Sequence, residues 1–541
     1  MFRKKFFNLN AEFKTVAGSA LVISGATLLS RLIGLFRDRV LAHYFGAGAV
    51  LDAYYAAFKI PDLIYNLLIV GALSAGFIPI FTRLFHQNKD DKKAAWDLTN
   101  NVINIMTLFM LVLGSLGIIF APYFVPLIAP GFTFENKQLV ISLMRIMFIS
   151  PVLFGLSMVF GGVLQSLRRF LLFSIAPLFY NLGIIIGAAY LTKVFGVKGL
   201  ALGVILGAFI HMVIQYYGAR QAGFRFKNIL NFKDKETRLI GKLMLPRTAG
   251  LAITQIDLLV VTFLASFLES GSLAIYTLAN NLQAVPIGLI GIPFALAVFP
   301  VLSKLAAENN LDSFVDQYHA ALRQIIFLIT PFLLVFLTLN TQIVRLILGS
   351  GSFDWHATLT TAQTLLYFSF GMLAQSLIPL MARAFYSLSN TKTPFTIGIV
   401  SETVAITAAI LLIRRYGIYG LAMGSAIGAT LNMFLLFIFL QLRLKKNNLA
   451  DLFYFLLKTF SAAIPAYLAI YYFEGVLKNL FDQTRFYGVF LQTFICTAIG
   501  LTVFCLLCYL LKLPEINYFF SSLKRQWFKL RSVPNEEIIN P

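Results

Sequence analysis

The chain has 541 residues, of which 59% are hydrophobic and 12% charged, and its mean hydropathy is +0.80. No soluble globular protein of this size has such a composition, so we expect an integral membrane protein without a large soluble domain. The net charge of +21 is compatible with nucleic-acid binding, but the basic residues are distributed as in the loops of a membrane protein, and we expect no nucleic-acid partner.

Apolar runs long enough to cross a bilayer recur along the whole chain. A spanning helix needs about 20 such residues, and in lipid its backbone polar groups must be satisfied within the segment. The sequence therefore predicts an all-α integral membrane fold with about fourteen transmembrane helices. The expected spans are 15–35, 50–81, 99–121, 139–166, 172–191, 199–217, 240–267, 274–303, 322–340, 358–387, 394–413, 419–440, 458–473 and 489–511.

The loops between these spans are not equally basic. Most lysines and arginines lie at the two termini and in the even-numbered loops, for example in "RKK" near the N-terminus and in the loop 220–242. Cytoplasmic loops of membrane proteins carry such an excess. The pattern predicts a multi-pass protein with both termini in the cytoplasm.

An internal repeat relates two parts of the chain at an offset of 221 positions. "GLALGVILGAFIHM" at 199–212 matches "GLAMGSAIGATLNM" at 420–433, and "FIPIFTRL" at 77–84 matches "VFPVLSKL" at 298–305. Because an even number of spans separates the copies, the two halves have the same orientation, as in transporters whose halves rock around a central site. We predict an N-lobe of helices 1–6 (1–220), a C-lobe of helices 7–12 (221–445), two further helices (446–515) and a basic cytoplasmic tail (516–541).

Charged residues gather in the first two spans, where an ionisable group is costly and usually lines a functional cavity. Arg31, Arg37 and Asp38 lie at the end of span 1, and Asp52 and Lys59 share a face of span 2. An excess of cations predicts an anionic substrate, and the planar fork of arginine suits phosphate. The alternative is structural: salt bridges between helices, and side chains that reach to the interface.

That structural interpretation is favoured for a further cation, Arg39. In the second lobe Asp257 and Glu402 lie inside spans 7 and 11. Buried acids there suit a proton or sodium ion that couples transport to a gradient, or else a salt bridge with Arg247 or Arg383. We expect no other cofactor and no metal site.

Several segments resemble a known family. They are "SRLIGLFRD" (30–38), "FGAGAVLDAYYAAFKIP" (45–61), "GALSAGFIP" (71–79), "PIGLIGIPFALAVFPVLS" (286–303) and "FYSLSNTKTP" (385–394). On these segments the chain resembles the MurJ/MviN family of lipid II flippases, in the multidrug/oligosaccharidyl-lipid/polysaccharide exporter superfamily. The likeness extends over about the whole chain.

The resemblance implies a transporter rather than an enzyme, in the bacterial inner membrane. Its cargo would be undecaprenyl-diphosphate-linked muropeptide, carried by alternating access from the cytoplasmic to the outer leaflet for peptidoglycan synthesis. The implied partners are lipid II, membrane lipids and cell-wall synthesis proteins.

The resemblance also implies a headgroup site. The family's arginines in helix 1 fall on Arg31 and Arg37, and its acids in helices 1 and 2 fall on Asp38 and Asp52. Together with Lys59 these residues would meet the diphosphate and sugar headgroup in a wet central cavity.

Three positions depart from the family pattern. Many members carry an arginine and a glutamate where this chain has Tyr65 and Val70, and an arginine in helix 8 where it has Asn281. Asn281 remains in the expected headgroup site, and Arg247 on span 7 is our hypothetical replacement for the lost cation.

Two more features follow from the resemblance. Some members place a sodium site among helices 7, 11 and 12, and Asp257 and Glu402 lie on two of these helices. Helices 13 and 14 of the family form a groove for the polyprenyl tail, and the spans at 458–473 and 489–511 are apolar enough to do so.

Other functions remain open at this stage. The nearest is another exporter of the superfamily, either a flippase for O-antigen or teichoic precursors or a drug/cation antiporter, although a drug pump would favour acids in the first lobe. A membrane-embedded glycosyl- or phosphotransferase would need an acid-rich Mg²⁺ site. The only clustered loop acids are Asp90 and Asp91, which lysines flank.

Overall fold

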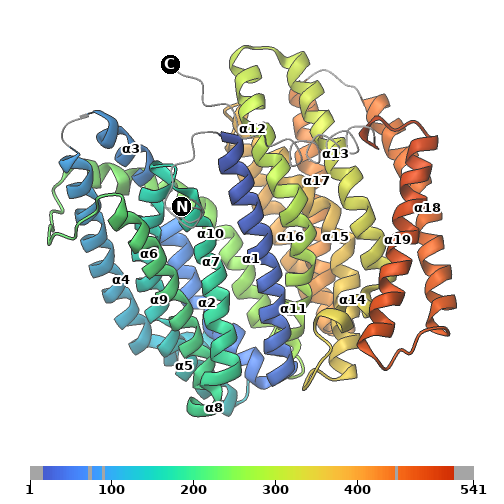
Figure 1. The fold of residues 1–541 in the computed structure, drawn as a ribbon, viewed down its shortest axis with the longest axis horizontal. Coiled ribbons are helices and arrows are strands. Elements are labelled where there is room, and N and C mark those ends of the chain that lie inside the picture. Colours follow the sequence, from blue (N-terminus) through green and yellow to red (C-terminus); the bar gives the residue numbers. More distant parts are fainter. Residues whose placement is uncertain (1–15, 71–75, 88–91, 445–448, 517–541) are drawn as a thin grey trace, which may run out of the picture. The chain divides into compact units, whose positions relative to one another are not determined.

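The computed structural model describes residues 16–70, 76–87, 92–444 and 449–516, without the helical side chains at 16–24, 68–70, 87 and 245–254. Within these ranges the chain is helical and has no strand (Figure 1). The extreme N-terminus, Asp90, Asp91 and the expected tail beyond residue 516 lie outside the described residues.

The first half of the chain forms helices α1 to α9, with short π-helical segments where the regular bonding pattern is interrupted. One such segment, η1, follows Pro61, which has no amide hydrogen to donate within α2. The helices are α1 (Val16–Phe45), α2 (Ala49–Ile64), η1 (Tyr65–Val70), α3 (Ile78–Gln87), α4 (Lys93–Ile128), α5 (Phe134–Met147), α6 (Ile149–Ser166), α7 (Phe170–Ile186), η3 (Gly187–Leu191), α8 (Thr192–Phe195) and α9 (Lys198–Gln221).

The second half has the same character. Its π-helical segment η4 follows Pro286, as η1 follows Pro61 in the first half. The helices are α10 (Lys235–Ala265), α11 (Ser272–Pro286), η4 (Ile287–Gly291), α12 (Ile292–Ala307), α13 (Leu311–Thr338), α14 (Asn340–Ile347), α15 (Trp355–Ser387), α16 (Lys392–Tyr416), α17 (Ile418–Leu444), α18 (Leu449–Lys478) and α19 (Phe486–Leu510).

The predicted fold class is confirmed. Among the described residues, 11 helical segments are long and apolar enough to cross a membrane. Three further helices, α1, α2 with η1, and α10, carry charged side chains within them and fall at the other predicted spans. The chain is therefore a multi-pass membrane protein. α1 continues to Phe45, ten residues beyond the expected end of the first span at 35.

The helix bounds follow the repeat found in the sequence. α5 and α6 together run from Phe134 to Ser166, and α15 runs from Trp355 to Ser387, so both ends are 221 positions apart. The break between α5 and α6 at Phe148 and the single long helix in the second copy do not disturb this register. The two halves therefore repeat one helical plan.

Close contacts divide the chain into two compact units. The described parts of Met1–Leu282, Ile347–Thr364 and Glu402–Gly424 form unit 1, and those of Gln283–Leu346, Leu365–Ser401 and Ser425–Pro541 form unit 2. α10 and the start of α11 thus belong to unit 1. The lobe boundary expected at residue 220 stays a prediction.

In unit 1, small residues bring α7 and α9 together. A Cβ atom on Gly183 would lie 2.3 Å from the Cα atom of Gly207, so only hydrogen fits between these backbones. Small residues at such crossings are typical of helices packed in membranes. Aromatic side chains, among them Phe77, Phe81 and Phe224, form a buried core between α3, α4, α6 and α9.

In unit 2, α18 and α19 lie side by side as a hairpin, drawn in red in Figure 1. Gly500 of α19 faces Ile470 of α18, where a Cβ atom would lie 2.3 Å from the isoleucine side chain. These are the two helices that the repeat does not account for. They pack on α13 as well as on each other.

Candidate functional site

Four polar side chains from three helices of unit 1 form one hydrogen-bonded group that contains the buried carboxylate of Asp38. We call Arg37, Asp38, Asn181 and Asn281 the Asp38 cluster. Nε and Nη2 of Arg37 donate to Oδ1 of Asp38 at 3.0 and 2.7 Å. Nδ2 of Asn281 on α11 donates to Oδ2 of Asp38 at 2.9 Å, and Nη1 of Arg37 donates to Oδ1 of Asn181 on α7 at 3.0 Å. Because Asp38 is only 2% exposed, it needs such partners for its charge.

Arg31 lies on the same face of α1 as Asp38, because the helix is continuous between them and seven residues make two turns. It is partly buried and about 10 Å further along the helix axis. The Arg37 side chain is 23% exposed. Its guanidinium is held by its own helix and by α7, which the sequence reasoning did not foresee.

Arg39 has a different role, at the end of α1. Its Nη1 donates to the carbonyl of Ile347 at 3.2 Å. Nearby, the amide of Ser352 donates to the carbonyl of His43 at 2.9 Å. These contacts fix the last turns of α1 to the segment that follows α14, in agreement with the structural interpretation favoured for Arg39.

A second charged group of unit 1 joins three helices; we call Lys59, Asp62, Asp257 and Glu402 the acid cluster. The ammonium of Lys59 on α2 is close to the carboxylates of Asp62, three residues on, and of Asp257 on α10. The carboxyl group of Asp257 in turn lies near that of Glu402 on α16. Oε1 of Glu402 is buried and has no hydrogen-bond partner in the described part of the chain.

The structure places the two acids that were singled out as coupling-ion candidates beside each other. Asp257 and Glu402 were expected on two separate spans, and they lie beside each other and near Lys59. Asp62 is exposed although it lies within a spanning helix.

Asp52 holds the beginning of α11. Its Oδ2 accepts from the amide of Gly271 at 2.6 Å and its Oδ1 from the amide of Ala274 at 2.8 Å. The first amides of a helix have no partner within it, so a carboxylate there caps the helix. Asp52 is 1% exposed and both its oxygens are engaged. Asp52 was expected among the headgroup ligands, but in this structure both of its carboxylate oxygens cap α11.

The positions that depart from the family pattern are only partly visible. The Tyr65 ring packs against that of Phe154, with 5.2 Å between centroids. The side chains of Val70 and Arg247 lie outside the described residues, so the hypothesis that Arg247 replaces a lost cation stays a prediction. At the third position, Asn281 still contacts the acid of helix 1, through an amide instead of a guanidinium.

Comparison with known proteins gives the family. A sequence model described as "Lipid II flippase MurJ" matches residues 41–491. The chain belongs to the MurJ family. A probable lipid II flippase MurJ of Vibrio cholerae is 31% identical over 437 residues, which are 78% of this chain and 82% of that protein. Another from Buchnera aphidicola subsp. Baizongia pistaciae is 27% identical over 503 residues, 90% of this chain and 96% of that protein.

Solved structures show the same fold. A structure described as lipid II flippase MurJ in an inward closed conformation has a TM-score of 0.75 at 24% identity, and covers 91% of this chain and 98% of its own. An inward-facing MATE family multidrug transporter of the MOP superfamily has a TM-score of 0.66 at 17% identity, over 79% of this chain and 98% of its own. The MurJ family is one of transporters and not of enzymes, which removes the transferase alternative.

Unit 2 contributes an apolar cavity of about 290 Å³. It lies between α13, the short helix α14 and the two C-terminal helices. Its lining includes Phe332 and Phe336 of α13, Ile343 of α14, Ile470 of α18 and Phe504 of α19. The cavity is where the MurJ resemblance led us to expect a groove for a polyprenyl tail, and α14, which the sequence did not predict, forms part of its wall.

Two functional candidates were missed from the sequence. Asn181 is the single amide side chain in the apolar helix α7. A polar residue in such a helix is the sequence signal that could have marked it as a candidate. Asp62 lies three residues after Lys59 on α2, which was the available signal for this acid. Neither could be placed against α1 or α10 without the packing of the helices.

Proposed function

We propose that the chain moves lipid II, an undecaprenyl-diphosphate-linked muropeptide, from the cytoplasmic to the outer leaflet of the inner membrane by alternating access. The observation that carries the proposal is the match to the MurJ family over residues 41–491. Two features of the chain itself support it: guanidinium and ammonium groups placed within spanning helices, and an apolar cavity in unit 2.

The headgroup would be held by Arg31 and Arg37, with Lys59 nearby. A guanidinium has five N–H groups, and three of those of Arg37 are used in the Asp38 cluster. The other two keep the fork geometry that matches phosphate oxygens. In this proposal Asp38 and Asn181 are positioning residues, which orient Arg37 before the diphosphate arrives, and Asn281 keeps Asp38 satisfied.

The tail would occupy the cavity between α13, α14, α18 and α19, or the surrounding lipid. The cavity is lined by aliphatic and aromatic side chains, which suit a polyprenyl chain. A drug/cation antiporter, the main alternative within the superfamily, has no need of an apolar cavity suited to a polyprenyl chain.

Complementation of a strain that is depleted of its lipid II flippase tests this function. We expect the wild-type chain to restore growth and the Arg31→Ala variant to fail. Arg39→Ala is the matched control, because it removes the same group from the same helix but outside the site, and it should restore growth. Failure of the wild-type chain, or rescue by Arg31→Ala at equal expression, would contradict the proposal.

We also propose that the acid cluster binds the cation that resets the transporter, either H⁺ or Na⁺. Two adjacent carboxyl groups share a proton or a small cation readily, and Oε1 of Glu402 is left for one of them. Transport into vesicles under an imposed sodium or pH gradient separates the two ions. The Glu402→Gln variant should lose the response to the coupling gradient, whereas Glu269→Gln, at an exposed acid outside the cluster, should keep it. Equal responses in both variants would contradict the assignment.

The distribution of lysine and arginine supports a further proposal, that both termini are cytoplasmic. A reporter enzyme that is active only outside the cytoplasm, fused after residue 541, should be inactive. Activity of that fusion would reverse the orientation.

A further inference from the structure

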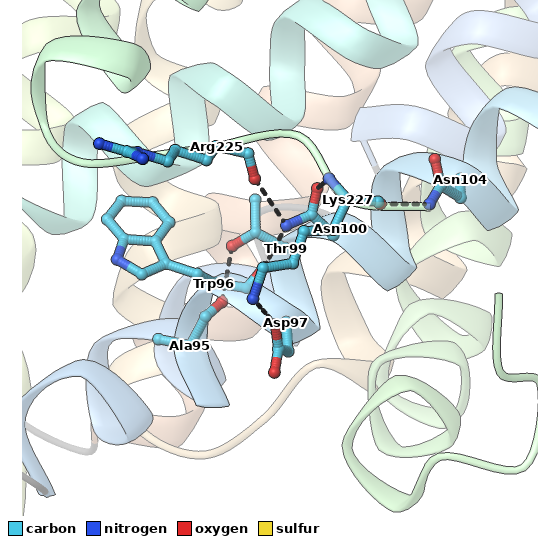
Figure 2. Close-up of polar contacts among 8 residues, drawn as sticks. All are labelled: Ala95, Trp96, Asp97, Thr99, Asn100, Asn104, Arg225 and Lys227. Carbon is cyan, nitrogen blue, oxygen red and sulfur yellow. Dashed lines mark hydrogen bonds and ion pairs between the residues drawn. The ribbon is translucent and has the colours of Figure 1, made fainter. Parts of the chain in front are cut away.

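The segment between α9 and α10 is bound along the first turns of α4 by asparagine side chains; we call residues 225–235 the strap. Nδ2 of Asn100 donates to the carbonyl of Arg225 at 3.0 Å, and Oδ1 of Asn100 accepts from the amide of Lys227 at 2.7 Å. Figure 2 shows this pairing, in which one side chain satisfies the backbone on both sides of residue 226. The strap is thus held by its backbone, and its side chains are left for other uses.

Two more asparagines repeat the arrangement further along. Asn101 donates to the carbonyl of Asn231 at 2.9 Å and accepts from its amide at 2.6 Å. Asn104 donates to the carbonyls of Lys227 and Ile229 at 3.0 and 2.8 Å. Because amide side chains offer both donors and acceptors, they bind an extended backbone much as a neighbouring strand would. The strap therefore has a fixed course on α4.

Charges on and around the strap are separated by sign. Three acids face inward: Asp234 of the strap, Asp97 of α4 and Glu236 of α10 line a pocket of about 320 Å³ between α3, α4 and the strap. Each has a partner: Lys227 pairs with Asp97 at 3.1 Å, Thr237 donates to Asp234, and Arg83 pairs with Glu236.

The remaining cations face outward. Arg225, Lys233 and Lys235 are exposed and form no ion pair within the described residues. In Figure 2 the side chain of Arg225 points away from the asparagines of α4. The outer surface of the strap is therefore cationic, while the acids beneath it are engaged by a cation or, for Asp234, by Thr237.

Large apolar side chains accompany these cations. Phe226, Leu230 and Phe232 are 62%, 51% and 56% exposed. Asn104, the last clamp, precedes the exposed Leu108 of α4 by one turn, which is about 6 Å along the axis. Since Leu108 belongs to an apolar spanning helix, the strap lies at the height where the hydrocarbon ends and the lipid headgroups begin.

We propose that the strap is a binding surface for the headgroups of anionic phospholipids. Its cations meet the phosphates, and its phenylalanines and leucine enter the interface beside them, which is the composition of interfacial membrane-binding segments. This inference does not depend on which lipid the protein transports. An acidic protein surface is the other conceivable occupant, and the experiment distinguishes the two.

Fluorescence quenching tests the proposal in reconstituted bilayers. The three tryptophans, Trp96, Trp355 and Trp527, are replaced by phenylalanine, and Phe232→Trp supplies a single indole on the strap. The bilayer contains phosphatidylglycerol and phosphatidylcholine, with a nitroxide near the top of the acyl chain of one or the other at equal mole fraction. We expect labelled phosphatidylglycerol to quench at least about twofold more than labelled phosphatidylcholine.

The charge variant is Arg225→Gln, Lys233→Gln and Lys235→Gln combined, and it should quench equally with both lipids. Its matched control, Lys193→Gln, Arg414→Gln and Arg415→Gln, removes as much charge elsewhere and should keep the preference. Equal quenching by both lipids in the single-tryptophan chain that keeps the strap cations would overturn the proposal. A preference for phosphatidylglycerol that survives in the charge variant would also overturn it. Absence of quenching by either lipid would also overturn it and would favour a protein partner.

Discussion

A carboxylate buried within a membrane protein needs partners for its charge, and Asp38 has them on α1 and α11. The guanidinium of Arg37 neutralises its charge through Oδ1, and the amide of Asn281 satisfies Oδ2. Breaking such a pair by removing one partner leaves a buried charge and is strongly unfavourable. The loss of the family's helix 8 arginine is tolerable here because an amide can still satisfy the second oxygen, provided that Arg37 supplies the charge.

This arrangement predicts a rescue. The Arg37→Gln variant should lose transport by roughly tenfold or more, because a hydrogen bond to a charged group is worth about 1.5–3 kcal/mol. In an Asn281→Arg background, which restores the family's cation beside Asp38, the same substitution should cost much less. Transport rates of the four chains, at equal expression, give the coupling between the two positions.

Independent effects of Arg37→Gln and Asn281→Arg would contradict this account of the Asp38 cluster. The variant Asn281→Gln is the control for size, since it keeps an amide and should rescue nothing.

At the scale of single helices, several features that shape the candidate sites cannot be recognised from the sequence of the helix alone. α11 begins where Asp52, 219 residues earlier, caps its amides, and η1 and η4 each follow a proline. α14 is short and completes the wall of the apolar cavity. These features depend on which helices are neighbours, and a pattern within one helix does not contain that information.

The cavity predicts a specific sensitivity to size on α19. The Thr497→Phe variant places a ring in the space lined by Thr497 and Gly500, and transport of a substrate with a long polyprenyl tail should fall. Thr502→Phe is the matched control, because Thr502 lies on the same helix but is exposed and outside the cavity, and it should behave as wild type. Rates for a substrate with a shortened tail should differ less between the two variants. If both variants transport the long-tailed substrate equally, the cavity does not hold the tail.

At the scale of the whole molecule, much could be predicted from the sequence. Within the described residues the expected spans fall on helices, and the offset of 221 recurs in the helix bounds, because length and apolarity are local properties that lipid enforces. The residues proposed for the headgroup site stand out in the sequence as charges in apolar segments. Their partners were not: that Asp52 caps α11, and that Asp257 meets Glu402, follows only from packing.

The central proposal is that the chain transports lipid II and binds its headgroup at residues on α1 and α2. The most direct measurement is the movement of labelled lipid II across proteoliposome membranes, followed with an impermeant enzyme that cleaves the exposed headgroup. The wild-type chain should expose the internal pool; Arg31→Gln should slow this by roughly tenfold or more, and Arg39→Gln should leave it unchanged. A wild-type chain that exposes no lipid II, or an Arg31→Gln variant as fast as wild type, would contradict the central claim.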